Sequence, residues 1–92
     1  MAIYAVVRGE AFVLECHKPF STVDIHIEDE EKHELDIIYH DTDPTSFMVI
    51  PDNVTEEIGI QGSHVTATLK CLNEDKEVEE HILIVHPDPM RG

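Results

Sequence analysis

Phe12-Val13-Leu14-Glu15-Cys16 and Ala67-Thr68-Leu69-Lys70-Cys71 are the two stretches that decide the fold class of this 92-residue chain. In a β-strand, alternate side chains lie on the same face. The first, third and fifth side chains of each stretch therefore share one face, and all of them are apolar. Each cysteine ends such an apolar row, which predicts that both cysteines point into the core of a β domain.

The two cysteines allow two states. If their strands belong to facing sheets, Cys16 and Cys71 meet across the core and form a disulfide. Closing the loop between them would stabilise the fold by about 4 kcal/mol in the chain-entropy model. A disulfide also implies an oxidising compartment. The alternative is a pair of free buried thiols, because cysteine is among the most buried residue types.

The rest of the chain repeats short apolar stretches separated by polar, proline-containing or glycine-containing turns. Asn53-Val54-Thr55-Glu56 has capping-box spacing and predicts one short helical turn, with Asn53 as its N-cap. Strands at this spacing are typical of an all-β, two-sheet sandwich. We expect seven of them, over residues 3–8, 11–17, 22–28, 34–40, 46–50, 65–73 and 78–86.

These stretches also resemble a known family. The run from Gly9 to Cys16 resembles the B strand of immunoglobulin domains, and residues 67–74 resemble the F strand and the turn after it. Residues 47–50 and 53–57 resemble the E strand and its corner. The chain is thus similar to I-set or C2-like domains of the immunoglobulin superfamily, including ectodomain repeats of growth-factor receptor tyrosine kinases. It departs from them in having no tryptophan and in having Leu69 where the conserved corner tyrosine stands.

The resemblance implies an immunoglobulin-like antiparallel sandwich of about seven strands with one inter-sheet disulfide. We expect the domain to span residues 1–86, and residues 87–92 to be a linker stub to a following domain. Pro87-Asp88-Pro89 is typical of a stiff connector. The start of the chain does not have the pattern of a secretory signal. We therefore interpret the chain as one module of a larger extracellular or cell-surface protein.

Charge narrows the class of partner. Twenty acidic residues against six basic ones give a net charge of −14. Such a surface repels phosphate groups, which excludes nucleic acid and anionic membranes as partners. No apolar run approaches the length of roughly 20 residues that a membrane span needs. A protein ligand, or neighbouring domains of the same chain, remain as partners, and a basic partner is compatible with the charge.

Strand parity predicts a partner-binding face. On the strand over 22–28, the outward side chains are polar or charged, whereas those between them are apolar. Exposed apolar side chains beside polar ones can mark a contact site. The alternative is a face with scattered surface hydrophobes. The predicted face consists of Asp24, His26, Glu28, Thr68, Lys70 and Leu83.

Other motifs add little. Asn53-Val54-Thr55 is an N-glycosylation sequon. His26 between two acidic residues could bind a metal or sense pH, but no pair of residues has zinc-ligand spacing, so we expect neither metal nor cofactor. No catalytic motif is found, so we expect no enzyme. The prediction is a non-catalytic extracellular module for protein recognition, in a receptor ectodomain or in cell adhesion. The alternative is an intracellular structural immunoglobulin repeat of a muscle or cytoskeletal protein, with both thiols reduced.

Overall fold

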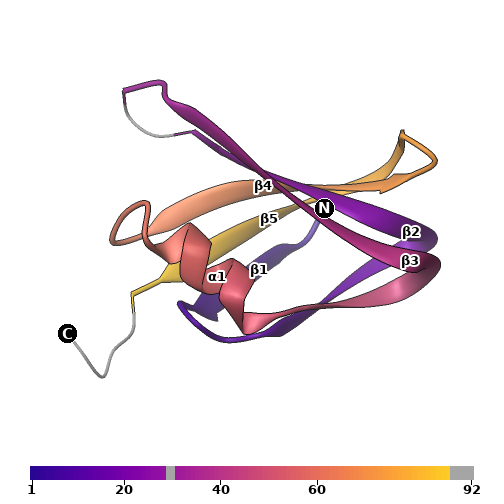
Figure 1. The fold of residues 1–92 in the computed structure, drawn as a ribbon, viewed down its shortest axis with the longest axis horizontal. Helices are drawn as coiled ribbons and strands as arrows, with labels where there is room; N and C mark the ends of the chain where they lie inside the picture. Colours follow the sequence, from indigo (N-terminus) through magenta and orange to yellow (C-terminus); the bar gives the residue numbers. More distant parts are fainter. Residues whose placement is uncertain (29–30, 88–92) are drawn as a thin grey trace.

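A computed structural model of the chain describes residues 1–28 and 31–87. The described residues form five strands and one helix (Figure 1). In chain order these are β1 (Ile3–Val7), β2 (Phe12–Glu28), β3 (Glu34–Ile50), α1 (Asp52–Gly59), β4 (Val65–Asn73) and β5 (Lys76–His86).

All five strands belong to one open, mixed sheet with the order β1-β5-β4-β2-β3. β1 and β5 are parallel, and the other neighbouring strands are antiparallel. The predicted immunoglobulin-like antiparallel sandwich is therefore wrong, because no second sheet exists among the described residues. The prediction of a mostly β chain is correct.

The error lies in the residues that were interpreted as turns. Lys18-Pro19 and the stretch from Asp41 to Pro44 lie inside strands β2 and β3, which each run for 17 residues. The ladder between β2 and β3 instead shifts register on either side of Phe20. Such irregularities bend a strand without ending it, and proline is tolerated at bulges and on edge strands such as β3. Two pairs of predicted strands thus merge, and seven become five.

The bend brings the first half of β2 close to β1 and β5 on the other side of the molecule. Side chains, not a backbone ladder, bridge this gap. The Tyr4 hydroxyl accepts the Glu15 N–H at 3.1 Å, and a carboxylate oxygen of Glu79 accepts the His17 N–H at 3.1 Å. We call this gap the seam. It is where two thiols, a carboxylate and two imidazoles gather.

The inner face of the curled sheet holds the core, and α1 packs on it through Val54 and Ile58. The predicted helical turn is confirmed, but Asn53 is not its cap, because the N-cap position is Pro51 and has no side-chain hydrogen bond. Thr55 instead ties the helix to the β1–β2 turn. Its buried hydroxyl accepts the Gly9 N–H at 3.0 Å and donates to the Glu10 carbonyl at 2.8 Å.

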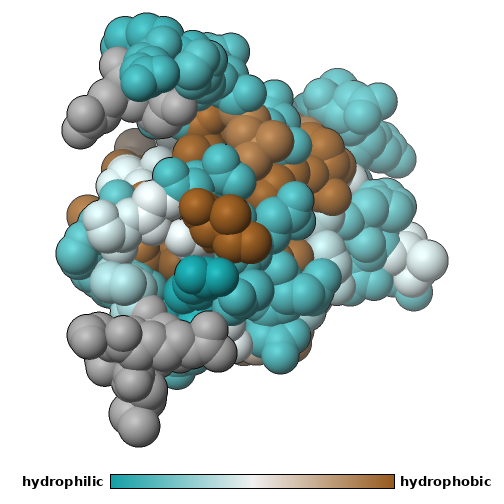
Figure 2. Space-filling model, turned by 60° about the vertical axis from the view of Figure 1, so that its left-hand side comes forward, coloured by the Kyte–Doolittle hydropathy of each residue, from teal (hydrophilic) through white to brown (hydrophobic). Residues whose placement is uncertain are grey.

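Hydrophobic side chains also reach the surface. Figure 2 shows a group of them between the tip of the β2–β3 hairpin and the helical region, framed by hydrophilic side chains. Ile60, directly after α1, is 64% exposed. Within the described part of the chain, no helix is long and apolar enough to cross a membrane.

Candidate functional site

Cys16 and Cys71 both point inward, as the alternation of apolar residues predicted, but they meet at the seam of one sheet and not between two sheets. Their sulfur atoms lie 2.7 Å apart, and both side chains are buried. They are nevertheless free thiols. The predicted disulfide is therefore wrong in this structure, and the alternative of two buried thiols describes it.

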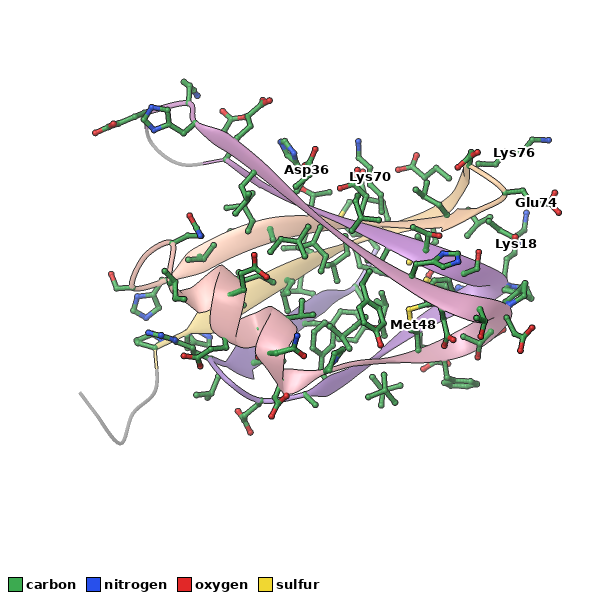
Figure 3. All side chains as sticks on the ribbon, viewed as in Figure 1. Lys18, Asp36, Met48, Lys70, Glu74 and Lys76 are labelled. Carbon is green, nitrogen blue, oxygen red and sulfur yellow. The ribbon has the colours of Figure 1, made fainter. Side chains whose placement is uncertain are left out.

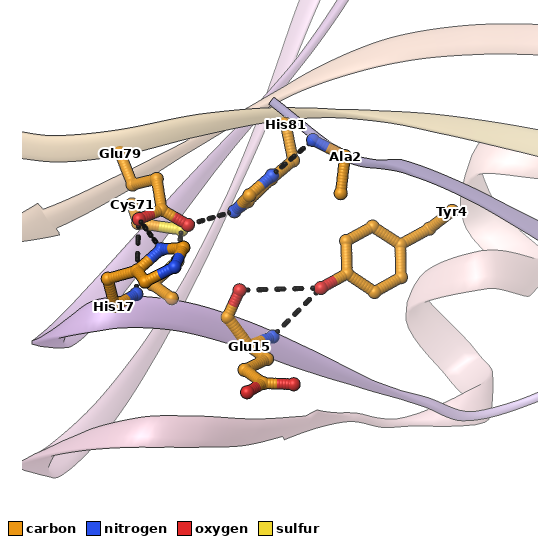
Figure 4. A network of polar contacts seen from close by, with 8 residues as sticks. Ala2, Tyr4, Glu15, His17, Cys71, Glu79 and His81 are labelled. Atoms are coloured by element: carbon orange, nitrogen blue, oxygen red, sulfur yellow. Dashed lines mark hydrogen bonds and ion pairs between the residues drawn. The ribbon is translucent and has the colours of Figure 1, made fainter.

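Two side chains of β5 join the thiols on the same face of the sheet. Glu79 lies beside Cys71 in the β4–β5 ladder, and His81 lies beside Leu69. His81 Nε2 and Glu79 Oε2 are 2.5 Å apart, whereas Glu79 Oε1 is 3.0 Å from His17 Nδ1 (Figure 4). The His81 side chain is 6% exposed and that of Glu79 is 18% exposed, whereas that of His17 is almost fully exposed. The seam thus holds a nearly buried carboxylate between two imidazoles.

The hydrogen bonds at His81 fix its tautomer. The Ala2 backbone N–H donates to His81 Nδ1 at 2.9 Å, so this nitrogen carries no proton. In the neutral ring the proton is then on Nε2, which donates to Glu79. His81 therefore links the chain segment before β1 to the carboxylate in the seam.

The surroundings shift the pKa values of the seam groups. Burial by itself raises the pKa of Glu79, but hydrogen bonds from His17 and His81 outweigh it and lower this pKa to about 2. Burial is the largest cause that raises the pKa of both Cys16 and Cys71, and the charge of Glu79 raises both further. At neutral pH the carboxylate is ionised and both thiols are protonated, so neither cysteine is an activated nucleophile.

The seam is open to solvent through a hollow of about 260 Å³. Donor atoms of Cys16, Glu79 and His81 all lie within 4.8 Å of one another at this hollow. Thiolate, imidazole and carboxylate are the groups that bind zinc in proteins. The hollow is lined by Ala2, Tyr4, Glu15, Cys16, His17, Glu79 and His81.

Glu79 and His81 are absent from the site residues predicted from the sequence, although the sequence contains a signal for them. Leu83 and Val85 are buried on the inner face of β5. Continuing that alternation backwards places residues 81 and 79 on the same face, at the end of β5 near Cys71. Glu77, Glu79 and Glu80 occur close together, so this end of the strand has the composition of a solvated turn.

The predicted partner-binding face is largely assembled. Asp24, His26, Thr68 and Lys70 are neighbours in the β2–β4 ladder, and the exposed Glu28 ends the same strand. They lie on the outer face of the sheet, opposite α1. Figure 3 shows Asp36 and Lys70 pointing away from the core on this side, whereas Met48 points inward.

Leu83 does not belong to this face. It is fully buried and pairs with Tyr4 and Ala67 on the inner side of the sheet. Its neighbours Ile82 and Ile84 lie on the outer face instead, where both are half-buried. The prediction for Leu83 is wrong because residues 82–85 are all apolar. Alternation alone therefore cannot show which of them face the core and which face outward.

One in-register row crosses the outer face over all five strands. It runs from Ile3 on the edge strand β1 to Asp36 on the edge strand β3. Ile3, at its apolar end, is 66% exposed. The row consists of Ile3, Ile82, Thr68, His26 and Asp36.

His26 is the centre of the acidic half of the outer face. Its Nδ1 atom is 2.5 Å from Asp36 Oδ1, and Nε2 is 4.0 Å from a carboxylate oxygen of Glu34. The hydrogen bond to Asp36 is the largest cause that raises the pKa of His26, and the nearby acids add to it. His26, Glu28 and Glu34 also bring donor atoms within 4.8 Å of one another. These two acids are exposed, which is common on an acidic surface without a bound ion.

The predicted glycosylation site lies on α1. Asn53 is exposed there, so its side chain is accessible. Thr55, the third residue of the sequon, is buried and holds the helix to the β1–β2 turn. This role accounts for Thr55 without a glycan, and glycosylation stays a prediction.

A scan against protein-family models and a search of curated proteins each found no match to this chain. Neither finding supports the resemblance to immunoglobulin domains, and the fold contradicts the architecture that the resemblance implied. The domain bounds of 1–86 stay a prediction, and residues 88–92 of the predicted linker lie outside the described residues.

Proposed function

We propose that this protein is a non-catalytic protein-binding module, and that its outer sheet face binds a protein surface that presents basic groups beside aliphatic ones. The observation that carries this proposal is the row from Ile3 to Asp36, which passes from the exposed Ile3 and the half-buried Ile82 to the carboxylate of Asp36 on one continuous face. α1 packs on the opposite face of the sheet.

Charge selects the partner. The half of the face on β2 and β3 carries four carboxylates, whereas Lys70 is the one lysine or arginine among the predicted face residues. Complementary charge guides association and excludes partners of the wrong sign. The half on β1 and β5 presents Ile3, Ala5 and parts of Ile82 and Ile84, which are suited to aliphatic contact. The carboxylates are those of Asp24, Glu28, Glu34 and Asp36.

The test uses a probe of defined chemistry. A synthetic peptide of alternating lysine and leucine is titrated into the ¹⁵N-labelled protein, beside a glutamate–leucine peptide of the same length. We expect the basic peptide to shift the amide signals of the row and the acidic peptide to leave them unchanged. Asp36→Lys should weaken binding about tenfold, since the contact is charged and partly solvated.

Two matched controls separate a specific face from general attraction to an acidic protein. Glu57→Lys makes the same charge change on α1, where residue 57 is exposed. Val49→Ser removes an aliphatic side chain that is 61% exposed elsewhere, to compare with Ile3→Ser at 66%. If each control weakens binding as much as its partner variant, or if the shifts map to α1, the outer face is not the binding site.

A further inference from the structure

The seam brings together four side chains of the types that bind metal ions in proteins. Cys16 comes from β2, Cys71 from β4, and Glu79 and His81 from β5. Three of their donor atoms lie within 4.8 Å of one another, and the fourth, Cys71 Sγ, is 2.7 Å from Cys16 Sγ. Three donors from β2 and β5 thus converge beside a hollow that gives access from solvent, and Cys71 of β4 adds a second thiol next to Cys16.

We propose that Cys16, Cys71, Glu79 and His81 form a tetrahedral zinc site that closes the seam of the curled sheet. This site is independent of the proposed binding site on the outer face, because the seam lies on the inner side of the sheet. It adds a metal site to a chain for which the sequence alone predicted none.

The donor types select the metal. Two thiolates disfavour magnesium and calcium, which prefer oxygen ligands, and favour zinc or copper(I). The imidazole and the carboxylate beside them favour zinc, which accepts sulfur, nitrogen and oxygen in one tetrahedral site. Because four protein groups fill that shell, the site is structural, with no position left for a substrate.

Zinc binding requires the seam side chains to move, because Cys71 Sγ lies outside the group of donors within 4.8 Å and His81 Nε2 is only 2.5 Å from Glu79 Oε2. Ligand atoms around a tetrahedral zinc are about 3.3–3.8 Å apart, given bond lengths of about 2.0–2.3 Å. The two sulfur atoms must therefore separate by about 1 Å from their present contact. Cys16 and Cys71 are on different strands, so a change of side-chain rotamer can provide this separation without changing the register of the sheet.

Zinc binding has a defined proton balance. Each thiol releases one proton to solvent as it becomes a thiolate. His81 must coordinate through Nε2, the atom that faces Glu79, so its proton has to leave that atom and Nδ1 becomes protonated. Nδ1 then can no longer accept the Ala2 N–H. Two protons are released in total, and the Ala2–His81 hydrogen bond is lost.

This balance gives a readout that a merely structural cluster would not give. We expect the reduced, metal-free protein to show His81 with its proton on Nε2. After addition of one equivalent of zinc, ¹⁵N NMR should show the proton on Nδ1, together with a shifted Ala2 amide. The wild-type chain suffices for this measurement, so the result does not depend on a variant that fails to fold.

Cobalt(II) provides the second measurement. We expect one cobalt ion per reduced chain, with thiolate-to-cobalt charge-transfer bands and the intense visible bands of tetrahedral cobalt. Zinc should displace the cobalt. Cys71→Ser and Glu79→Gln should each weaken binding by more than about tenfold, since even outer-shell changes at metal sites cost about that much.

Two control variants change residues of the same chemical types on the same strand, outside the proposed ligands. Glu77→Gln changes an exposed carboxylate on the same strand, and His86→Asn changes a histidine at its other end. Both should leave cobalt binding unchanged. The proposal is overturned if the folded, reduced wild type binds no cobalt, if binding lacks the thiolate bands, or if the His81 tautomer is the same with zinc. Undiminished binding by Cys71→Ser would show that Cys71 is not a ligand and would overturn the four-ligand site.

Discussion

The seam and the outer face each pair a histidine with a carboxylate at 2.5 Å, but the two pairs differ in their surroundings. At the seam, the side chain of His81 is 6% exposed, whereas on the outer face that of His26 is 31% exposed. At the seam the lowered pKa is that of the carboxylate Glu79. On the outer face the raised pKa is that of the histidine.

The difference follows from the other groups that each pair contacts. Glu79 accepts hydrogen bonds from His17 and His81, so several donors stabilise one ionised carboxylate. His26 is one imidazole surrounded by several carboxylates, so its protonated, positively charged form is stabilised instead. The same two residue types thus provide a fixed anion at the seam and a titratable cation on the outer face.

The largest effect is expected from two neighbours on β5. Leu83→Glu places a charge in the core, where the native side chain is fully buried, and should destabilise the fold by more than about 4 kcal/mol. Ile82→Glu adds the same charge on the outer face and should cost about 1 kcal/mol. Urea unfolding of both variants gives the comparison. Similar losses would mean that the two faces are assigned wrongly.

The two carboxylates provide the next comparison. In reduced, metal-free protein at neutral pH, Glu79→Gln should destabilise the fold by about 2 kcal/mol, because donors are left facing an amide. Asp36→Asn changes an exposed partner and should cost less than about 0.5 kcal/mol. Urea midpoints of the two variants measure the difference. If Asp36→Asn costs more than Glu79→Gln, burial does not distinguish the two pairs.

The pH dependence separates charge from shape at the seam. The pKa of Glu79 is lowered from 4.5 to about 2 in the folded protein. Its contribution to stability is therefore present above pH 4.5 and is lost as the pH falls towards 2. The difference in free energy of unfolding between wild type and Glu79→Gln should shrink over this window. Glu77→Gln is the control, and a difference that persists at pH 2 would indicate a packing effect.

The sequence predicts local structure well in this chain. Alternation on β2 and β4 correctly places Cys16 and Cys71 inside, and the outward side chains of residues 24–28 outside. It does not distinguish a turn from a bulge. Lys18-Pro19 is a turn signal in general, but here β2 continues through it and bends. Whether such a segment ends a strand depends on partners far away in the chain, which local patterns do not contain.

The lack of long-range information in local patterns also explains why the seam could not be predicted from the sequence. The seam exists only because the bend in β2 brings residues 16 and 17 to Glu79 and His81, more than 60 residues away. No local motif records this approach, and a disulfide between the two cysteines is the simpler interpretation of their shared burial. Alternation along the last strand does predict that residues 79 and 81 point inward, because it puts them on the same face as Leu83. What it lacked was the fold that places Cys16 opposite them.

The smallest effect is expected at His26, and it concerns protonation more than stability. Its pKa is raised above 6.5, chiefly by the hydrogen bond to Asp36. Any stabilisation from the charged ring is therefore present below pH 6.5 and is lost as the pH rises through the folded pKa. An NMR titration of the ring should show this raised pKa, and Asp36→Asn should return it towards the ordinary value. If Asp36→Asn leaves the titration unchanged, the acidic surface as a whole controls His26, and the close pair on the outer face has no special role.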